Sequence, residues 1–326
     1  MKRILLALMA VAVVWGIFTP PDCPAPLVWR KGEGWTWERG GVAVGNNPKE
    51  QLEIARALSQ QKDHGSAVTA YRRLIRRWPT SYAVEDARLG LAESLSALDY
   101  HFKAFKEYQQ LIEKHPNSPH FETALQRQFE IANLFLAGQR DKAWGVKWFP
   151  ARDKAIDIFE QVVKNGPYSK VGPDAQFRIG VAQEMLKDYV AAVRAYEKVT
   201  ERYPNLPLAE KAQFQIGYAY RQEAGRFEYD QNAANQAVAA FTDFLVRYPD
   251  SERAPQAEEY RAALKGEQAQ GLFRVGQFYE KRREYKAAII YYNEVIEQNP
   301  KSNWATEAQT KVLALNAQLQ KPTATP

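Results

Sequence analysis

Cysteine is nearly absent from this sequence, since Cys23 is the only one among 326 residues. A single cysteine excludes an intramolecular disulfide framework and any cysteine-rich zinc or iron–sulfur site. Histidine is also scarce. His64, His101, His115 and His120 form neither an i, i+4 pair nor a metal-ligand motif with a carboxylate. We therefore expect no metal site.

Motifs of catalysis are missing too. The chain has no glycine-rich phosphate-binding loop and no Gly-x-Ser-x-Gly nucleophile motif. One Ser-x-x-Lys string, Ser59 to Lys62, lacks the companion motifs of penicillin-recognising enzymes and falls on a predicted helix. The sequence therefore predicts a protein that is not an enzyme and uses no cofactor or small-molecule substrate.

No hydrophobic run reaches the ~20 residues of a typical membrane-spanning helix. The longest follows Lys2 and Arg3 and extends from Ile4 to Phe18 without a charge. A short basic head before such a stretch is typical of a bacterial secretory signal, so residues 1–22 are predicted to be a signal peptide or an uncleaved signal anchor. Lipidation of Cys23 is disfavoured, because Pro-Pro-Asp precedes it instead of the small or aliphatic residues of a lipobox.

Residues 23–47 are predicted to be a linker rich in proline, glycine and tryptophan. Its three tryptophans are Trp29, Trp35 and Trp37. Two interpretations stay open: a docking segment or short strand laid on a partner, or rings that cover the exposed end of the first repeat.

One pattern recurs six times in the remainder of the chain. An alanine is followed by an aromatic residue at +4, an aliphatic or aromatic residue at +7 and a proline at +12. The first three positions share one helical face, and the proline ends the helix. A Gly or Ala upstream, such as Gly180 and Gly276 twelve residues before Ala192 and Ala288, predicts close packing of a preceding helix. The alanines are Ala67, Ala104, Ala155, Ala192, Ala237 and Ala288.

These offsets resemble the tetratricopeptide repeat, a pair of antiparallel helices in 34 residues. The resemblance implies an all-α, right-handed tetratricopeptide-repeat solenoid of about six helix pairs over residues 48–316. Residues 317–326 are then expected to form a disordered tail. The repeats are placed at about 48–81, 85–118, 125–167, 173–206, 210–251 and 269–302.

A closer resemblance covers residues 210–316. Tyr203-Pro204, the segment from Tyr248 to Ser251 and the segment from Phe273 to Ala288 are similar to the BamD-like family. That resemblance implies an exported scaffold of outer-membrane β-barrel assembly, which docks barrel-assembly subunits or unfolded barrel substrates at the periplasmic face of the outer membrane. The family pattern has five repeats and a lipidated N-terminal cysteine. The alternative is a periplasmic tetratricopeptide adaptor of another envelope machine, such as a pilus or secretion complex.

Candidate binding residues lie three positions before each Gly or Ala of the first helices. Within the register they point to the concave face or to the neighbouring helix, so they are either stacked core rings or a ladder that receives a peptide or partner helix. Tyr218, Arg221, Glu184 and Glu280 do not hold that position but are expected beside it on the same face. The candidate groove residues are Phe129, Phe177, Phe214, Tyr218, Arg221 and Phe273.

Most of the formal charge of +6 belongs to the first repeat. Residues 48–81 hold seven basic and three acidic residues, a net charge of +4. Arg72, Arg73, Arg76 and Arg77 are predicted to share one side of its second helix. This face is either simply solvated or a contact for anionic lipid or an acidic partner. The export signal and the absence of a recognised nucleic-acid-binding motif argue against nucleic acid.

Overall fold

A computed structural model describes residues 27–30, 34–37, 42–139, 141–143, 146–149, 152–225 and 231–320. The whole predicted signal (residues 1–22), Cys23 and the last six residues lie outside these ranges. Within the described residues, no helix combines the length and hydropathy needed to cross a bilayer.

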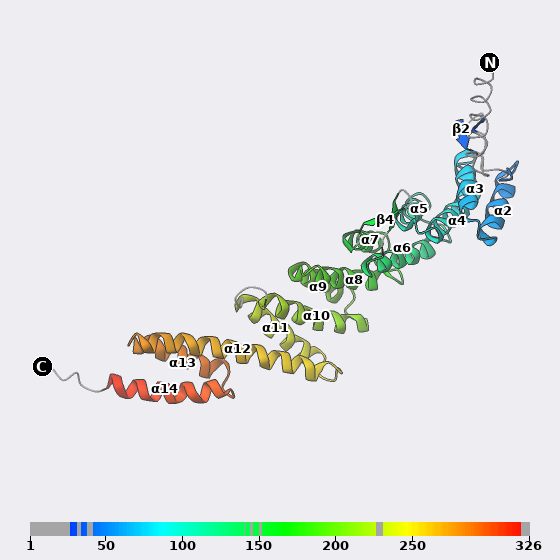
Figure 1. Cartoon of the computed structure of the whole chain (residues 1–326). Coiled ribbons are helices and arrows are strands. Elements are labelled where there is room, and N and C mark those ends of the chain that lie inside the picture. The colour runs from blue at the N-terminus through cyan, green and yellow to red at the C-terminus, as the bar shows by residue number, and fades with distance from the viewer. Residues whose placement is uncertain are drawn as a thin grey trace, which may run out of the picture. The chain divides into compact units, whose positions relative to one another are not determined.

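The described chain is almost entirely helical and divides into two compact units, residues 1–151 and 152–326 (Figure 1). The all-α prediction is confirmed. The first unit holds α2 (Pro48–Gln60), α3 (His64–Arg77), α4 (Ala83–Ala97), α5 (His101–Lys114) and α6 (Phe121–Leu136). The second holds α7 (Arg152–Asn165), α8 (Gly172–Met185), α9 (Tyr189–Arg202), α10 (Pro207–Ala224), α11 (Gln231–Arg247), α12 (Ala254–Lys281), α13 (Tyr285–Gln298) and α14 (Asn303–Leu319).

Two short antiparallel hairpins belong to the first unit. Strand β1 (Leu27–Arg30) pairs with β2 (Gly34–Trp37), and Trp29 stands opposite Trp35 in the register. Strand β3 (Asp141–Ala143) pairs with β4 (Val146–Phe149). The first hairpin matches the short-strand alternative for the tryptophan segment, and what it contacts stays open.

The recurring pattern forms the core of each repeat. All six pattern alanines are fully buried, and the +4 ring and the +7 side chain are at most 3% exposed in every repeat. These residues lie on the second helix of each pair and face the first. Because the alanine side chain is small, the two helix backbones can approach each other closely. The aromatic ring at +4 then fills the core of each repeat. The predicted helical face is confirmed.

The turn between the two helices of a pair uses left-handed backbone. Lys62, Asp99, Lys187 and Arg283 all have φ of 62–63°, and Gly138 has φ of 88° after α6. In the first and fourth repeats an aspartate then caps the next helix, with Asp63 accepting from the Ser66 N–H and Asp188 from the Ala191 N–H. This aspartate satisfies an otherwise unpaired donor and fixes where the second helix begins.

Within each unit every helix packs on its sequence neighbours, and several first helices also contact the next first helix. The contacting first-helix pairs are α2 with α4, α8 with α10, and α12 with α14. These pairs place parts of the row of first helices side by side within each unit. The right-handed course of the array across both units stays a prediction.

Helix α12 crosses the predicted boundary before the sixth repeat. The sequence places the start of the sixth repeat at 269, but α12 runs unbroken for 28 residues from Ala254. Its first half contributes Ala257 and Leu264 to the core of the fifth repeat, and its second half contributes Leu272 and Phe273 to that of the sixth. A further helix, α14, covers the last pair and extends to Leu319, so the tail predicted from 317 is helical in its first residues.

Candidate functional site

Helices α10 and α12 bring aromatic rings and arginines together in the second unit. Phe214, Tyr218 and Arg221 follow one another at i, i+4 and i+7 on α10 and therefore share a face. The Arg221 guanidinium carbon lies 4.3 Å from the ring centroid of Tyr260, and that of Arg253 lies 5.2 Å from the centroid of Phe214. The Tyr218 and Tyr260 centroids are 6.3 Å apart. We call these five residues the aromatic–arginine cluster.

The aromatic–arginine cluster has a buried base and an accessible outer layer. Phe214 is 4% exposed and packs edge to face on Phe241 and Phe244. The other four members are half-buried. Tyrosine and arginine are the residue types that most often dominate protein–protein binding energy, and stacking on a ring preorganises the guanidinium. The outer layer is therefore suited to bind a protein segment.

Two carboxylates occupy the same repeat position on this row of first helices. Glu184 follows Gly180 by four residues, and Glu280 follows Gly276 by four. Each meets the side chain 31 residues further on, on the next first helix. Gln215 Nε2 donates to both oxygens of Glu184 at 3.3 Å, whereas Lys311 Nζ donates to Glu280 Oε1 at 3.0 Å.

The two carboxyls have opposite pKa shifts. Burial raises the pKa of Glu184 to about 7, and the neighbouring Tyr196 hydroxyl offsets this only in part. Burial also acts on Glu280, but the hydrogen bonds from Tyr292 and Lys311 and the charge of Lys311 together lower its pKa below the usual value. Glu184 is thus a carboxyl with an amide partner where its counterpart has a cation.

Replacing Gln215 with lysine is expected to restore the missing charge pair. In the wild type, the folded pKa of Glu184 lies above the unfolded value of 4.5, so stability falls as pH rises from 4.5 to about 7. Gln215→Lys should remove that fall and raise the free energy of unfolding near pH 8 by about 1 kcal/mol, after allowance for solvent screening.

Urea unfolding of both proteins across this pH range measures the effect. Gln309→Lys, at an exposed position on α14, is the control for an added positive charge. A pH profile of Gln215→Lys that parallels the wild type would contradict the assigned pKa of Glu184.

The structure separates the predicted groove residues. Phe214, Tyr218 and Arg221 lie together, as described above. Phe273 is 1% exposed and packs between Tyr292 and Trp304, with centroids at 5.1 and 5.2 Å. Phe214 and Phe273 are therefore core rings and are not available to line a groove, because the adjoining helix covers each of them.

Two further candidates lie apart from the aromatic–arginine cluster. Phe177, on α8, is half-buried and packs on Tyr196 with centroids 5.1 Å apart. Phe129, on α6, is half-buried and belongs to the first unit. Their part in binding stays a prediction.

The four arginines of α3 do not form one face. Arg73 is 6% exposed, because its position turns toward the protein interior, whereas Arg72, Arg76 and Arg77 are exposed. Arg77 stacks on Trp78, with its guanidinium carbon 4.6 Å from the ring centroid. Arg72 and Arg76 line a groove that does not include Arg77 among its lining residues. The prediction of a single basic side is wrong for Arg73.

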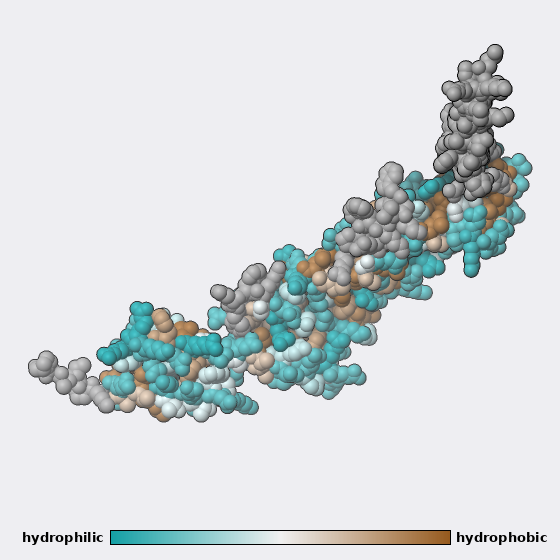
Figure 2. All heavy atoms as spheres, viewed as in Figure 1, coloured by the Kyte–Doolittle hydropathy of each residue, from teal (hydrophilic) through white to brown (hydrophobic). Residues whose placement is uncertain are grey.

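Polar residues dominate the view of the second unit in Figure 2, where hydrophobic residues form small patches among hydrophilic ones. Among the described residues, no group of three His, Cys, Asp or Glu side chains is placed to hold a metal ion. The face of the second unit that is seen in Figure 2 carries no broad apolar surface among its described residues.

The sequence did not reveal every member of the site. Tyr260 and Arg253 were missed because they lie in the stretch before the predicted start of the sixth repeat. Gln215 and Lys311 could have been found, since both follow a carboxylate by 31 residues and so occupy equivalent positions on the next first helix.

The repeat geometry and the first-helix face define a tetratricopeptide-repeat protein. Residues 51–81 and 86–118 each match the tetratricopeptide repeat, which confirms the prediction for the first two repeats. Residues 153–325, just over half of the chain, match YfiO, described as an outer membrane lipoprotein. The chain belongs to this family.

A known protein with a similar sequence points to the same family. The chain is 28% identical over 156 residues to the outer membrane protein assembly factor BamD of Caulobacter vibrioides. The match covers 48% of this chain and 51% of that protein, so the chain spans about half the length of this relative.

Solved structures resemble the chain at lower levels. The crystal structure of the MamA protein is 16% identical, with a TM-score of 0.36, and the match covers 65% of this chain and 96% of MamA. A tetratricopeptide repeat protein from Parabacteroides merdae is 13% identical, with a TM-score of 0.35 over 82% of this chain and 100% of that protein.

Proposed function

We propose that this protein is an exported, non-catalytic scaffold that takes part in assembling β-barrel proteins into the outer membrane. The observation that carries the proposal is the family match over residues 153–325, together with the relative named as an outer membrane protein assembly factor. The matched residues include α8 to α14, the part of the chain that presents the aromatic–arginine cluster.

In this proposal the work of the protein is docking. A partner segment lies along the first helices of the second unit and contacts Tyr218, Arg221 and Tyr260. The rings supply contact area at low cost in conformational entropy, and Arg221 is held by its stacking on Tyr260 at 4.3 Å. Gln215 and Glu184 provide hydrogen-bonding groups on the same row. The partners are barrel-assembly subunits or unfolded barrel proteins.

The location follows from the same proposal. Residues 1–22 direct export, and the protein works at the periplasmic face of the outer membrane or in the periplasm. Cys23 is the only residue that a thioether-linked lipid could modify, because the chain has no other cysteine. The mass of the mature N-terminal peptide distinguishes a cleaved signal, a lipidated Cys23 and an uncleaved anchor.

A double variant tests the docking surface. Tyr218→Ala combined with Arg221→Ala is expected to reduce the captured barrel-assembly partner to about a tenth or less, since residues of these types dominate interface energies. Both side chains are half-buried at the outer layer, so the fold should persist. Tagged full-length protein is purified from detergent-solubilised envelope, and the captured partners are quantified by mass spectrometry.

Arg247→Ala on α11 serves as the matched control, because Arg247 is exposed and lies on a second helix away from the cluster. It should capture partners as the wild type does. Equal capture by all three proteins would remove the aromatic–arginine cluster from the proposed docking surface.

A further inference from the structure

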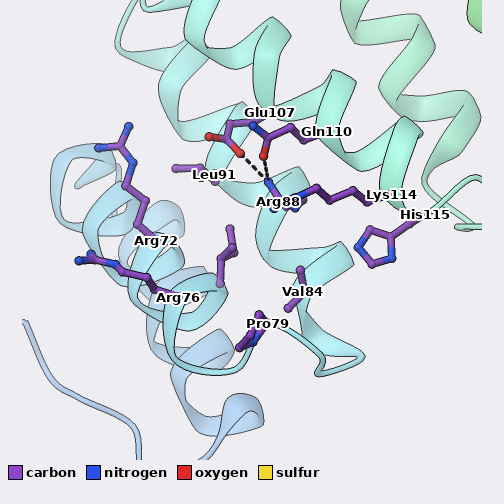
Figure 3. A pocket seen from close by; sticks show the side chains of 11 residues that line it. Arg72, Arg76, Pro79, Val84, Arg88, Leu91, Glu107, Gln110, Lys114 and His115 are labelled. Atoms are coloured by element: carbon purple, nitrogen blue, oxygen red, sulfur yellow. Dashed lines mark hydrogen bonds and ion pairs between the residues drawn. The ribbon is translucent and has the colours of Figure 1, made fainter. Parts of the chain in front are cut away.

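A basic groove of about 530 Å³ lies in the first unit between α3 and α5, over α4 (Figure 3). Arg72 and Arg76 reach it from α3, and Lys114 reaches it from the end of α5. All three side chains are exposed, and none forms an ion pair with any described residue. Ile75, Val84 and Leu91 provide apolar contact area between these cations.

The floor of this groove carries an arginine where the other repeats carry a neutral residue. Arg88 lies four residues before Ala92, the Gly or Ala position of its first helix. The corresponding residues of the first, third, fourth and fifth repeats are all glutamines, while the sixth has a leucine. Two of the glutamines donate to a carbonyl of their own second helix, at 3.2 and 3.0 Å. The glutamines are Gln51, Gln128, Gln176 and Gln213.

Arg88 is only partly satisfied by the protein. It is 7% exposed, and its Nη1 donates to Glu107 at 3.0 Å and to Gln110 (Figure 3). Its Nε–H has no hydrogen-bond partner among the described residues. A buried donor without a partner is costly, and an acceptor that enters the groove relieves that cost.

A second groove allows the contribution of the rim cations to binding to be distinguished from that of the floor residue. It has the same volume of about 530 Å³, lies between α7 and α9 over α8, and is also rimmed by basic side chains, including Lys164 and Arg202. Its floor holds Gln176, whose amide already donates to the Ala195 carbonyl. Rim charge is therefore common to both grooves, and the buried arginine distinguishes the first.

We propose that the first groove binds an acidic segment of a partner protein. One carboxylate of the segment accepts from the Nε–H of Arg88, neighbouring carboxylates lie against Arg72, Arg76 and Lys114, and an apolar side chain packs on the walls. A flexible Asp or Glu side chain enters a groove more readily than a phosphate held in a bilayer surface does, and it meets the buried Nε–H when the Arg88 side chain turns toward the groove. This surface lies outside residues 153–325 and is independent of the proposed function.

Binding of a fluorescent peptide of alternating Glu and Leu to the full-length protein in detergent tests the proposal. Arg76→Glu is expected to weaken binding about tenfold or more, because it reverses a charge at the rim. Lys164→Glu makes the same change at the equivalent position of the second groove and should alter affinity by less than about twofold. Arg88→Gln, which installs the residue of the other repeats, should also weaken binding about tenfold.

Arg76 is exposed, so its variant reports on binding even if Arg88→Gln loses stability; circular dichroism checks the fold of each. Equal weakening by Arg76→Glu and Lys164→Glu would overturn the proposal, because the acidic peptide would then be attracted to positive charge in general and not to the first groove. A folded Arg88→Gln protein that binds like the wild type would also overturn it. So would an inert peptide combined with Arg88-dependent binding to phosphatidylglycerol vesicles, which would assign the groove to a lipid headgroup.

Discussion

Replacing Phe214 with alanine should lower the free energy of unfolding by about 3–5 kcal/mol, as expected for the loss of a buried aromatic ring. The ring is 4% exposed, and its centroid lies 5.8 Å from that of Phe241 and 5.5 Å from that of Phe244. The α10–α11 core cannot collapse into the space, because rings on three sides already hold each other in place. Urea unfolding followed by circular dichroism measures the loss.

Tyr218→Ala is the matched control for this prediction. Tyr218 lies one turn further along α10 and is half-buried, and the ring contact found for it is Tyr260 at 6.3 Å. Its removal should lower the free energy of unfolding by less than about 1.5 kcal/mol. Equal losses for the two variants would contradict the division of the aromatic–arginine cluster into a buried base and an accessible outer layer.

Adding a methyl group at Gly180 should destabilise the second unit by about 1–3 kcal/mol. A Cβ at this position would lie 2.4 Å from Cε1 of Tyr196, and this ring is fully buried. The ring would have to move, but Ala192 and Val199 on its own helix are fully buried in the same core. Gly180→Ala is again measured by urea unfolding.

The change in the free energy of unfolding caused by Gly271→Ala should have the opposite sign. Gly271 also lies inside a helix, α12, but a Cβ there meets nothing within 4 Å. Alanine should therefore stabilise the protein by about 0.5–1 kcal/mol through the lower conformational entropy of the unfolded chain. Two glycine-to-alanine changes of the same sign would contradict the view that Gly180 is required by close approach of α8 and α9.

The helical repeats could be predicted because the same local sequence pattern recurs in each of them. Spacings of four and seven residues fix a helical face, and a small residue opposite an aromatic ring fixes where two helices meet. Those features are local, so the buried pattern residues and the close approach at Gly180 and Gly276 were found from the sequence alone. The continuity of helix α12 across the fifth and sixth repeats was not predicted, because no local signal marks the point where one helix leaves one core and enters the next.

The candidate site was less predictable, because burial depends on distant neighbours. Phe214 and Tyr218 occupy one face of α10, but the packing of α11 and α12 decides that the first is covered and the second is partly open. Arg73 and Arg76 are three residues apart on α3, but only Arg73 is buried, and this depends on the elements that pack around the helix. Arg88 becomes informative only when its unpaired Nε–H is seen at the floor of a groove.

The measurement that tests the proposed function most directly is affinity purification of the full-length protein from detergent-solubilised envelope, followed by mass spectrometry of everything that co-purifies. The account predicts that subunits of the outer-membrane β-barrel assembly machinery, or unfolded barrel proteins, are enriched over a tag-only control. Enrichment of pilus or secretion-complex components, with no barrel-assembly subunit present, would contradict it.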